Sequence, residues 1–157
     1  MVLVLILSST PASAQFVSLV GGPPPVQDFN ALAASGTSST LPNGWYLAET
    51  DDNANSEYRA GDGSVNSGDT YSFGAGTDSE RAFGTLQSSS LVSRIGAQLR
   101  NDSGLAVTEI TVNYTGEQWR LGATGRADTL KFEYSANATG LNDPAANWTP
   151  ALALDFD

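Results

Sequence analysis

The stretch Ile110-Thr111-Val112-Asn113-Tyr114-Thr115 decides how this chain is expected to fold. Apolar and polar side chains alternate along it, and a period of two places one set on each face of a β-strand. Two other runs alternate in the same way, Ile95-Gly96-Ala97-Gln98-Leu99-Arg100 and Leu130-Lys131-Phe132-Glu133-Tyr134-Ser135. Strands that bury one face and expose the other are typical of antiparallel sheets.

Turn residues divide the rest of the chain at short intervals. Their spacing predicts further strands over residues 45–49, 57–59, 70–74 and 81–87, the last two as a hairpin. Residues 26–29 are a candidate edge strand, with a single helical turn over 28–34 as the alternative. Many short strands with one-sided burial predict an all-β, antiparallel two-sheet β-sandwich, most simply a jelly roll. Residues 154–157 read as a strand, so we expect the sandwich to be truncated at its C-terminus.

Composition restricts the chemistry of the chain. Its 157 residues suffice for one domain with a core. The net charge of −10 disfavours nucleic-acid and anionic-membrane partners. The absence of Cys and His excludes disulfides, thiolate chemistry and imidazole as base or metal ligand.

The first residues have the pattern of an export signal. An apolar run over residues 2–7 is followed by Ala12-Ser13-Ala14, which is an A-x-A cleavage site. We therefore expect a signal peptide over 1–14, a Gly/Pro tether over 15–25 and a β-sandwich domain over 26–157. The apolar run is too short for a stable transmembrane helix. A secreted or cell-surface protein without a membrane span in its mature chain is predicted.

Six short motifs lie between residue 28 and residue 135. They are Asp28-Phe29-Asn30 with Leu32, Leu41-Pro42-Asn43-Gly44-Trp45-Tyr46, Gly68-Asp69-Thr70-Tyr71-Ser72-Phe73-Gly74, Glu80-Arg81-Ala82-Phe83-Gly84, Tyr114-Thr115-Gly116-Glu117-Gln118-Trp119-Arg120 and Phe132-Glu133-Tyr134-Ser135. Together they resemble a family of secreted bacterial jelly-roll domains of unassigned function. The similarity extends from residue 26 to the C-terminus.

The resemblance implies an architecture similar to carbohydrate-binding modules, of the concanavalin A-like or galactose-binding-like type. It also implies a place at the N-terminal end of a larger extracellular or surface protein. The family completes its sandwich with a Trp-x-Asp element and a Gly-x-x-Ile-Asp-Asp-like ending, and neither is present in this sequence. This departure agrees with a truncated sandwich. Fold resemblance by itself does not establish function.

One acidic stretch has the oxygen-ligand spacing of a calcium loop. Carboxylates and amides at alternate positions are ligands that Ca²⁺ prefers, although the EF-hand pattern is not met because Ser56 replaces its glycine. The alternative is a solvated loop with Asx turns. The candidate ligands of a structural calcium ion are Asp51, Asn53, Asn55, Glu57, Asp62 and Asp69.

Aromatic side chains offer a second kind of site, because sugar rings stack their C–H faces on aromatic rings. Any one aromatic is also a candidate core residue, as expected for Trp45, Phe73, Phe83 and Phe132. Glu117 and Arg120 either flank a site or form an ion pair that fixes a bend after Gly116. The candidate ligand-binding residues are Trp119, Tyr46, Tyr58, Arg120 and Glu117, and Tyr71 and Trp148 also offer ring faces.

Three functions are compatible with these patterns. The first is a secreted, non-catalytic module that binds a polysaccharide or another cell-surface polymer. The second is a structural or adhesion spacer. The third is a glycoside-active enzyme with two carboxylates, for which Glu49, Glu57, Glu80, Glu117 and Glu133 are available without a recognisable motif.

Overall fold

The computed structural model describes residues 15–20, 22, 25–76, 78–125 and 127–157. Among these residues there is no α-helix, so the prediction of an all-β chain is confirmed, and no helix could cross a membrane. The predicted signal peptide, residues 1–14, lies outside the described residues. The elements are β1 (Val17–Leu19), β2 (Thr37–Ser38), β3 (Trp45–Thr50), β4 (Tyr58–Gly61), β5 (Asp69–Phe73), β6 (Ala82–Leu86), β7 (Val92–Ala97), β8 (Leu99–Asn101), β9 (Glu133–Tyr134), β10 (Thr149–Pro150) and the 3-10 helix η1 (Leu152–Leu154).

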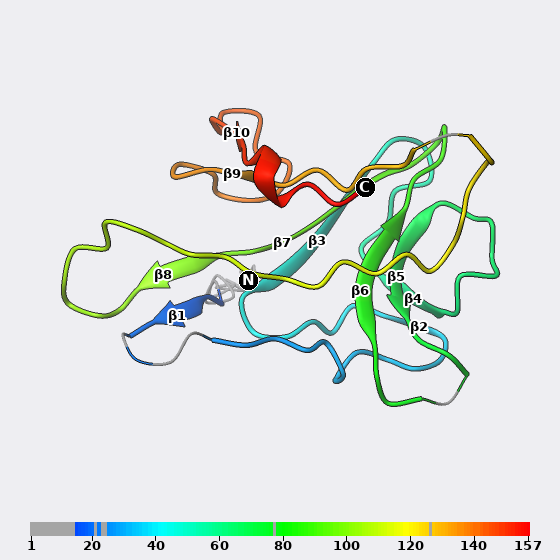
Figure 1. Cartoon of the computed structure of the whole chain (residues 1–157), viewed down its shortest axis with the longest axis horizontal. Helices are drawn as coiled ribbons and strands as arrows, with labels where there is room; N and C mark the ends of the chain where they lie inside the picture. The colour runs from blue at the N-terminus through cyan, green and yellow to red at the C-terminus, as the bar shows by residue number, and fades with distance from the viewer. Residues whose placement is uncertain (1–14, 21, 23–24, 77, 126) are drawn as a thin grey trace, which may run out of the picture.

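A four-stranded sheet with the order β2-β4-β5-β6 forms the best-buried part of the molecule (Figure 1). All five residues of β5 are buried in this sheet. Strands β5 and β6 are antiparallel, with registers that run from Asp69 opposite Leu86 to Phe73 opposite Ala82. This pairing confirms the hairpin expected from residues 70–74 and 81–87.

A second sheet consists of β3 and β7, which pair antiparallel over their full length. The buried core between the two sheets contains Tyr58 from β4 and Phe83 from β6, together with Leu32. Half-buried side chains of β3 and β7 pack on this core, namely Trp45, Leu47 and Ile95. Two sheets packed over a shared apolar core are consistent with a β-sandwich. The jelly-roll strand order remains a prediction.

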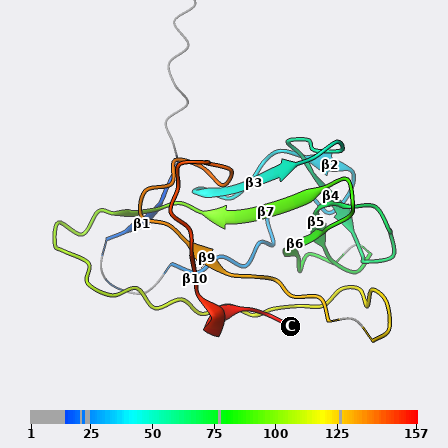
Figure 2. The same cartoon turned by 90° about the horizontal axis from the view of Figure 1, so that it is seen from above.

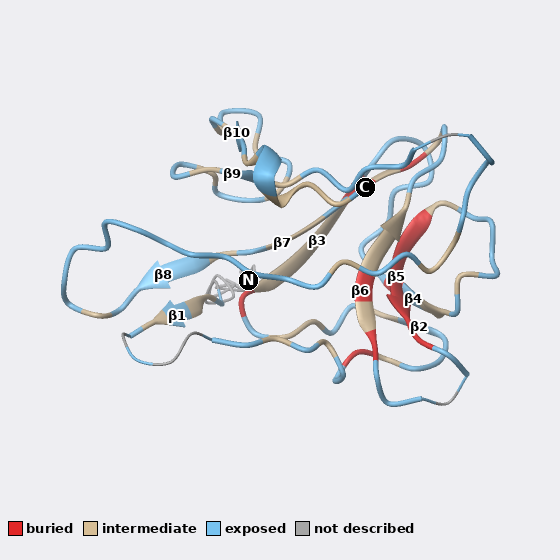
Figure 3. Ribbon diagram, viewed as in Figure 1, coloured by how far each residue is buried: buried red, intermediate tan, exposed pale blue. Residues whose placement is uncertain are grey.

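Burial falls off away from these two sheets (Figure 3). Every residue of β8, β9 and β10 is exposed. Figure 2 shows the yellow part of the chain, after β8, running along the side of the molecule opposite β3. The core is therefore concentrated in the first two thirds of the chain.

The stretch with the clearest alternation does not form a strand. Residues 105–125 contain no assigned strand, and Ile110 is 54 % and Val112 38 % exposed. A strand needs a neighbour that pairs with its backbone, and among the described residues none pairs with this segment. Side chains hold it instead, because Tyr114 stacks on Phe132 at 6.2 Å and its hydroxyl donates to the Leu154 carbonyl.

Three further expectations differ from the structure. Residues 26–29 form no strand, and a turn closed by the Leu32 N–H and the Phe29 carbonyl follows them. The pairing is not wholly antiparallel, since β4 pairs parallel with β5 and β1 pairs parallel with β8. The polar loop 62–68 makes the parallel pairing of β4 with β5 possible, because it carries the chain back to the start of β5. Strand β1 itself lies within residues 15–25, which were expected to be a tether.

Candidate functional site

The indole of Trp119 lies against the four-stranded sheet, although the sequence around it forms no strand. Its ring is stacked on Phe73 of β5, with centroids 6.0 Å apart and planes 8° from parallel. Phe73 is stacked in turn on Tyr71, with centroids 4.9 Å apart. Tyr71 and Phe73 are buried, whereas Trp119 is half-buried. We call Trp119, Phe73 and Glu117 the Trp119 platform.

Polar contacts fix the indole in this position. Its Nε1 donates a hydrogen bond of 2.9 Å to Glu117 Oε2. Arg120 Nη1 donates to the carbonyls of Gly63 and Ser64, both at 3.2 Å. A Cβ at Gly63 would lie 2.1 Å from the Trp119 carbonyl oxygen, and its φ of +82° also favours glycine. The ring is thus held in place by contacts within the protein.

These contacts replace the ion pair between Glu117 and Arg120 that the sequence suggested as one alternative. Glu117 binds the indole, and Arg120 binds the loop that follows β4. The two side chains therefore serve different partners. The bend that the sequence suggested after Gly116 stays a prediction, because the backbone there has no assigned turn or bend.

The two candidate tyrosines lie away from the platform. Tyr58 is 1 % exposed in the core, where its hydroxyl donates to the Thr40 carbonyl at 3.1 Å and accepts from the Ala33 N–H at 2.9 Å. Its ring is consequently covered and cannot stack on a sugar. Tyr46 is half-buried on β3, and its hydroxyl donates to the Gln15 carbonyl at 2.6 Å.

A buried polar cluster joins the two sheets. Glu49 Oε1 on β3 accepts hydrogen bonds from the N–H of Thr70 on β5 at 2.9 Å and from its Oγ1 at 2.7 Å. Thr70 Oγ1 is also 2.6 Å from Ser93 Oγ on β7. Glu49 Oε2 accepts from the Asn55 N–H at 3.0 Å. Both oxygens of this carboxylate are therefore occupied by groups of the protein itself.

Asp69 is a second buried carboxylate next to this cluster. Burial, followed by the negative charge of Glu49, raises the pKa of Asp69 above its ordinary value. Arg59 Nε lies 3.4 Å from Asp69 Oδ2 and opposes the shift, but the arginine side chain is largely exposed. Glu49 and Asp69 are thus two buried carboxylates, and the charge of one raises the pKa of the other.

The candidate calcium ligands are divided between loops. Asp51 and Glu57 are exposed, and the Asn55 Oδ1 accepts a hydrogen bond from the Glu57 N–H at 2.7 Å. Asp62 Oδ1 accepts from the Ser64 N–H at 3.0 Å in an Asx turn. In the described part of the chain, no three acidic side chains lie close enough to hold a metal ion. Calcium binding stays a prediction from the sequence.

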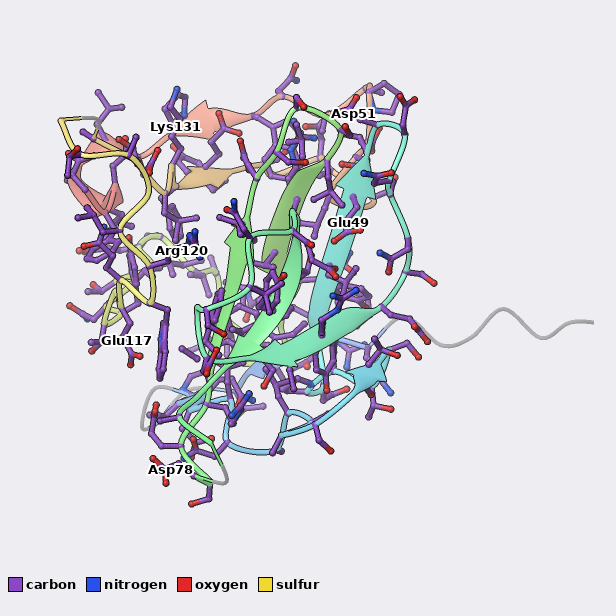
Figure 4. The ribbon with its side chains drawn as sticks, turned by 90° about the vertical axis from the view of Figure 1, so that its right-hand side faces the viewer. Glu49, Asp51, Asp78, Glu117, Arg120 and Lys131 are labelled. Carbon is purple, nitrogen blue, oxygen red and sulfur yellow. The ribbon has the colours of Figure 1, made fainter. Side chains whose placement is uncertain are left out.

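Figure 4 shows how the charged candidates are distributed. Glu49 and Asp51 lie on one side, at β3 and just after it, whereas Glu117 and Arg120 lie on the opposite side. Asp51, one predicted metal ligand, therefore lies on the side opposite Glu117 and Arg120, whereas Asp62 belongs to the loop whose Gly63 and Ser64 carbonyls bind Arg120. Asn53 lies in the same loop as Asp51, and its N–H donates to the Ser90 carbonyl at 3.0 Å.

Two groups stand out in the structure that the sequence did not indicate. Glu49 was one of several unassigned glutamates, and only the pairing of β3 with β7 brings it to Thr70. Arg81 was only one residue of the motif Glu80-Arg81-Ala82-Phe83-Gly84, and the structure buries it. No local pattern indicated this burial, which depends on Ser72 of β5.

Comparison of the chain with protein-family models, with curated proteins and with solved structures finds no match in any of the three. The resemblance to secreted jelly-roll domains therefore remains a hypothesis based on the motifs quoted above. The site must be judged from its own geometry.

Proposed function

We propose that this chain is a secreted, non-catalytic β-sandwich module that binds a glycan or another surface polymer within a larger extracellular protein. The observation that supports it best is the half-buried indole of Trp119, stacked on Phe73 and tied to Glu117. A ring held in place before binding loses little conformational entropy when a ligand stacks on it. Glu117, an exposed carboxylate beside the ring, can accept hydrogen bonds from sugar hydroxyls.

The disposition of the carboxylates agrees better with binding than with catalysis. A glycosidase places two carboxyl groups on either side of an accessible bond. Here Glu49 and Asp69 are buried, and Glu49 is saturated by Thr70 and Asn55. Glu49 joins β3 to Thr70 of β5 and so serves the contact between the sheets.

A glycan array tests the proposal. The full chain is applied with and without calcium, next to Trp119→Ala and to Trp148→Ala as a matched control, because Trp148 is also half-buried but precedes β10. We expect selective binding that Trp119→Ala removes and Trp148→Ala retains. Equal binding by all three proteins, or no binding by the wild type, would reject the sugar-binding proposal.

A structural or adhesion role is the second candidate, and a specific observation favours it. Large apolar side chains are exposed along one segment that has no strand partner among the described residues, namely Leu105, Ile110 and Leu121. Such residues commonly mark contacts with another surface. Sedimentation velocity over a range of concentrations would separate the two roles, because an adhesion module of this kind should self-associate and a monomeric binding module should not.

A further inference from the structure

The chain runs from residue 106 to residue 122 without a turn or bend, on the side of the molecule opposite β3 (Figure 2). Within it, no N–H or C=O group of residues 108–116 bonds to another backbone group of the described residues. Every residue from 104 to 115 is exposed, including the apolar side chains of Ile110 and Val112. An extended segment with free backbone groups is a template for a further β-strand.

Segment 108–116 offers a longer edge than the exposed strands elsewhere in the described chain. Strands β9 and β10 have two residues each, and β8 has three. Segment 108–116 has the length of an ordinary strand in a sheet. A partner can therefore form a full ladder of backbone hydrogen bonds along this segment, whereas the short strands offer only a few bonds.

Side chains already hold this segment in place. Tyr114 is stacked on Phe132, and its hydroxyl donates to the Leu154 carbonyl. Val112 lines a shallow hollow together with Leu154 and Phe156. These contacts involve side chains, so they leave the main-chain groups of the segment available. A strand that is fixed before pairing loses less conformational entropy when the partner arrives.

The distribution of charge indicates which partner fits. The net charge of the chain is −10, yet Glu109 is the only charged residue between positions 104 and 116. Two copies of so acidic a chain repel each other over most of their surface, and the repulsion is weakest where their charges are fewest. A basic peptide is the other partner that an acidic protein attracts, but it would meet a single carboxylate here. The charge pattern therefore favours a second copy of the chain.

Segment 108–116 is complementary to itself when two copies run antiparallel with Val112 opposite Val112. This register sets Ile110 opposite Tyr114, and pairs of a β-branched and an aromatic residue stabilise sheets. It sets Glu109 opposite Thr115, so no two carboxylates face each other. A parallel pair in register would instead bring the two Glu109 side chains together, which is unfavourable.

We propose that segment 108–116 pairs with the same residues of a second copy, antiparallel about Val112, in a closed two-fold dimer. This inference goes beyond glycan binding and deepens the structural role, because it names the surface that the exposed segment contacts. A two-fold contact uses the same residues on both copies and is complete with two chains. A module paired in this way can still bind a glycan through Trp119.

Sedimentation velocity of the full chain over a range of concentrations tests the assembly. We expect a shift from one chain to two and no larger species. Val112→Lys sets two cations opposite each other at the two-fold axis and should weaken the dimer at least about tenfold. Val107→Lys is the matched control, because it changes the charge equally at a valine that is 43 % exposed, against 38 % for Val112. A wild type that stays a single chain, or equal weakening by the two lysines, would overturn the proposal.

Disulfide cross-linking tests the register, because the chain has no cysteine of its own. In the proposed register the two Val112 Cα atoms lie about 4.5–5.5 Å apart, a distance that a disulfide spans. The two Val107 Cα atoms lie about 34 Å apart along the ladder. We expect Val112→Cys to form a covalent dimer under mild oxidation and Val107→Cys to remain a single chain. Equal cross-linking of the two variants, or none at position 112, would contradict the proposed pairing.

The outcomes distinguish this inference from the proposed glycan binding. A Val112→Cys cross-link in a chain that binds no glycan would support the dimer and reject the sugar-binding proposal. Glycan binding that Trp119→Ala removes, in a chain that forms no cross-link at position 112, would support the binding module and reject the dimer.

Discussion

Thr70 on β5 and Glu49 on β3 are joined by two hydrogen bonds, through the Thr70 N–H at 2.9 Å and its Oγ1 at 2.7 Å, to the same carboxylate oxygen. Thr70 is fully buried and Glu49 nearly so. Because β3 and β5 belong to different sheets, this contact fixes how the two sheets face each other. An isolated apolar core specifies such an arrangement less sharply than a satisfied polar contact does.

Truncation of Glu49 should therefore destabilise the sandwich. Glu49→Ala leaves the Thr70 N–H and hydroxyl with fewer partners, at a cost of about 1–3 kcal/mol in the free energy of unfolding. Glu49→Gln keeps one acceptor oxygen and should cost less. Urea denaturation followed by fluorescence measures both. If Glu49→Ala were more stable than Glu49→Gln, the contact would contribute nothing to the free energy of unfolding.

Asp69 should make the stability of the domain depend on pH. Its pKa is raised in the folded chain by burial and then by Glu49, so folding favours its protonated form. The contribution of Asp69 is fully present below its unfolded pKa of about 3.9 and is lost as the pH rises through the folded pKa. Asp69→Asn should therefore melt at a higher temperature than the wild type at pH 7, with a smaller difference near pH 3.

The Asp69 prediction has a built-in control. Arg59→Gln removes the largely exposed partner of Asp69 and should lower the stability at pH 7 only slightly, because exposed ion pairs contribute little. Thermal melts at five pH values give all three profiles. Parallel profiles for the wild type and Asp69→Asn would contradict the assignment of a raised pKa.

The core contribution of Tyr58 can be separated into ring and hydroxyl. Tyr58→Phe removes hydrogen bonds to Ala33 and Thr40 and should cost about 1 kcal/mol. Tyr58→Ala also removes a ring that packs at 6.1 Å on Phe83, and should cost about 3–5 kcal/mol. Chemical denaturation measures both. A cost below 1 kcal/mol for Tyr58→Ala would mean that the ring is not in the core and remains available to a ligand.

Gly44 should control whether β1 stays attached. Its φ is +78°, and a Cβ would lie 2.3 Å from the Val17 backbone nitrogen. We expect Gly44→Ala to release β1 from β8 and to speed proteolysis within residues 15–20, while the core remains folded. Limited proteolysis with mass spectrometry detects the cut, and Gly104→Ala is the control, because that glycine also has a positive φ but open space around it. Identical digestion patterns would refute the role of Gly44.

The sequence predicted those parts of the fold that depend on residues close together in the chain. The hairpin of β5 and β6 and the strand β3 follow from alternation and turn residues close in the sequence. Alternation predicted a strand at Ile110 and Val112 that does not form, since a strand also needs a neighbour to pair with. The alternation pattern also could not predict the parallel pairing of β4 with β5, because it shows only which face of a strand is apolar.

The sequence could predict a site residue only where the chemistry depends on the type of that residue alone. Trp119 was recognised as a flat ring, but its stacking on Phe73 depends on contacts between segments far apart in the sequence. Tyr58 has the same chemistry and is buried, and no local signal separates the two. Arg81 was missed because its burial is set by Ser72 and by the glycines of the neighbouring strands.

The proposed glycan binding depends most on the indole of Trp119 as a preformed ligand surface. Affinity electrophoresis through gels that contain a soluble polysaccharide identified by the array tests this most directly. We predict that the wild type and Trp148→Ala are retarded and that Trp119→Ala migrates as in a gel without polysaccharide, while its circular dichroism spectrum shows that it is folded. Equal retardation of Trp119→Ala and the wild type would contradict the account.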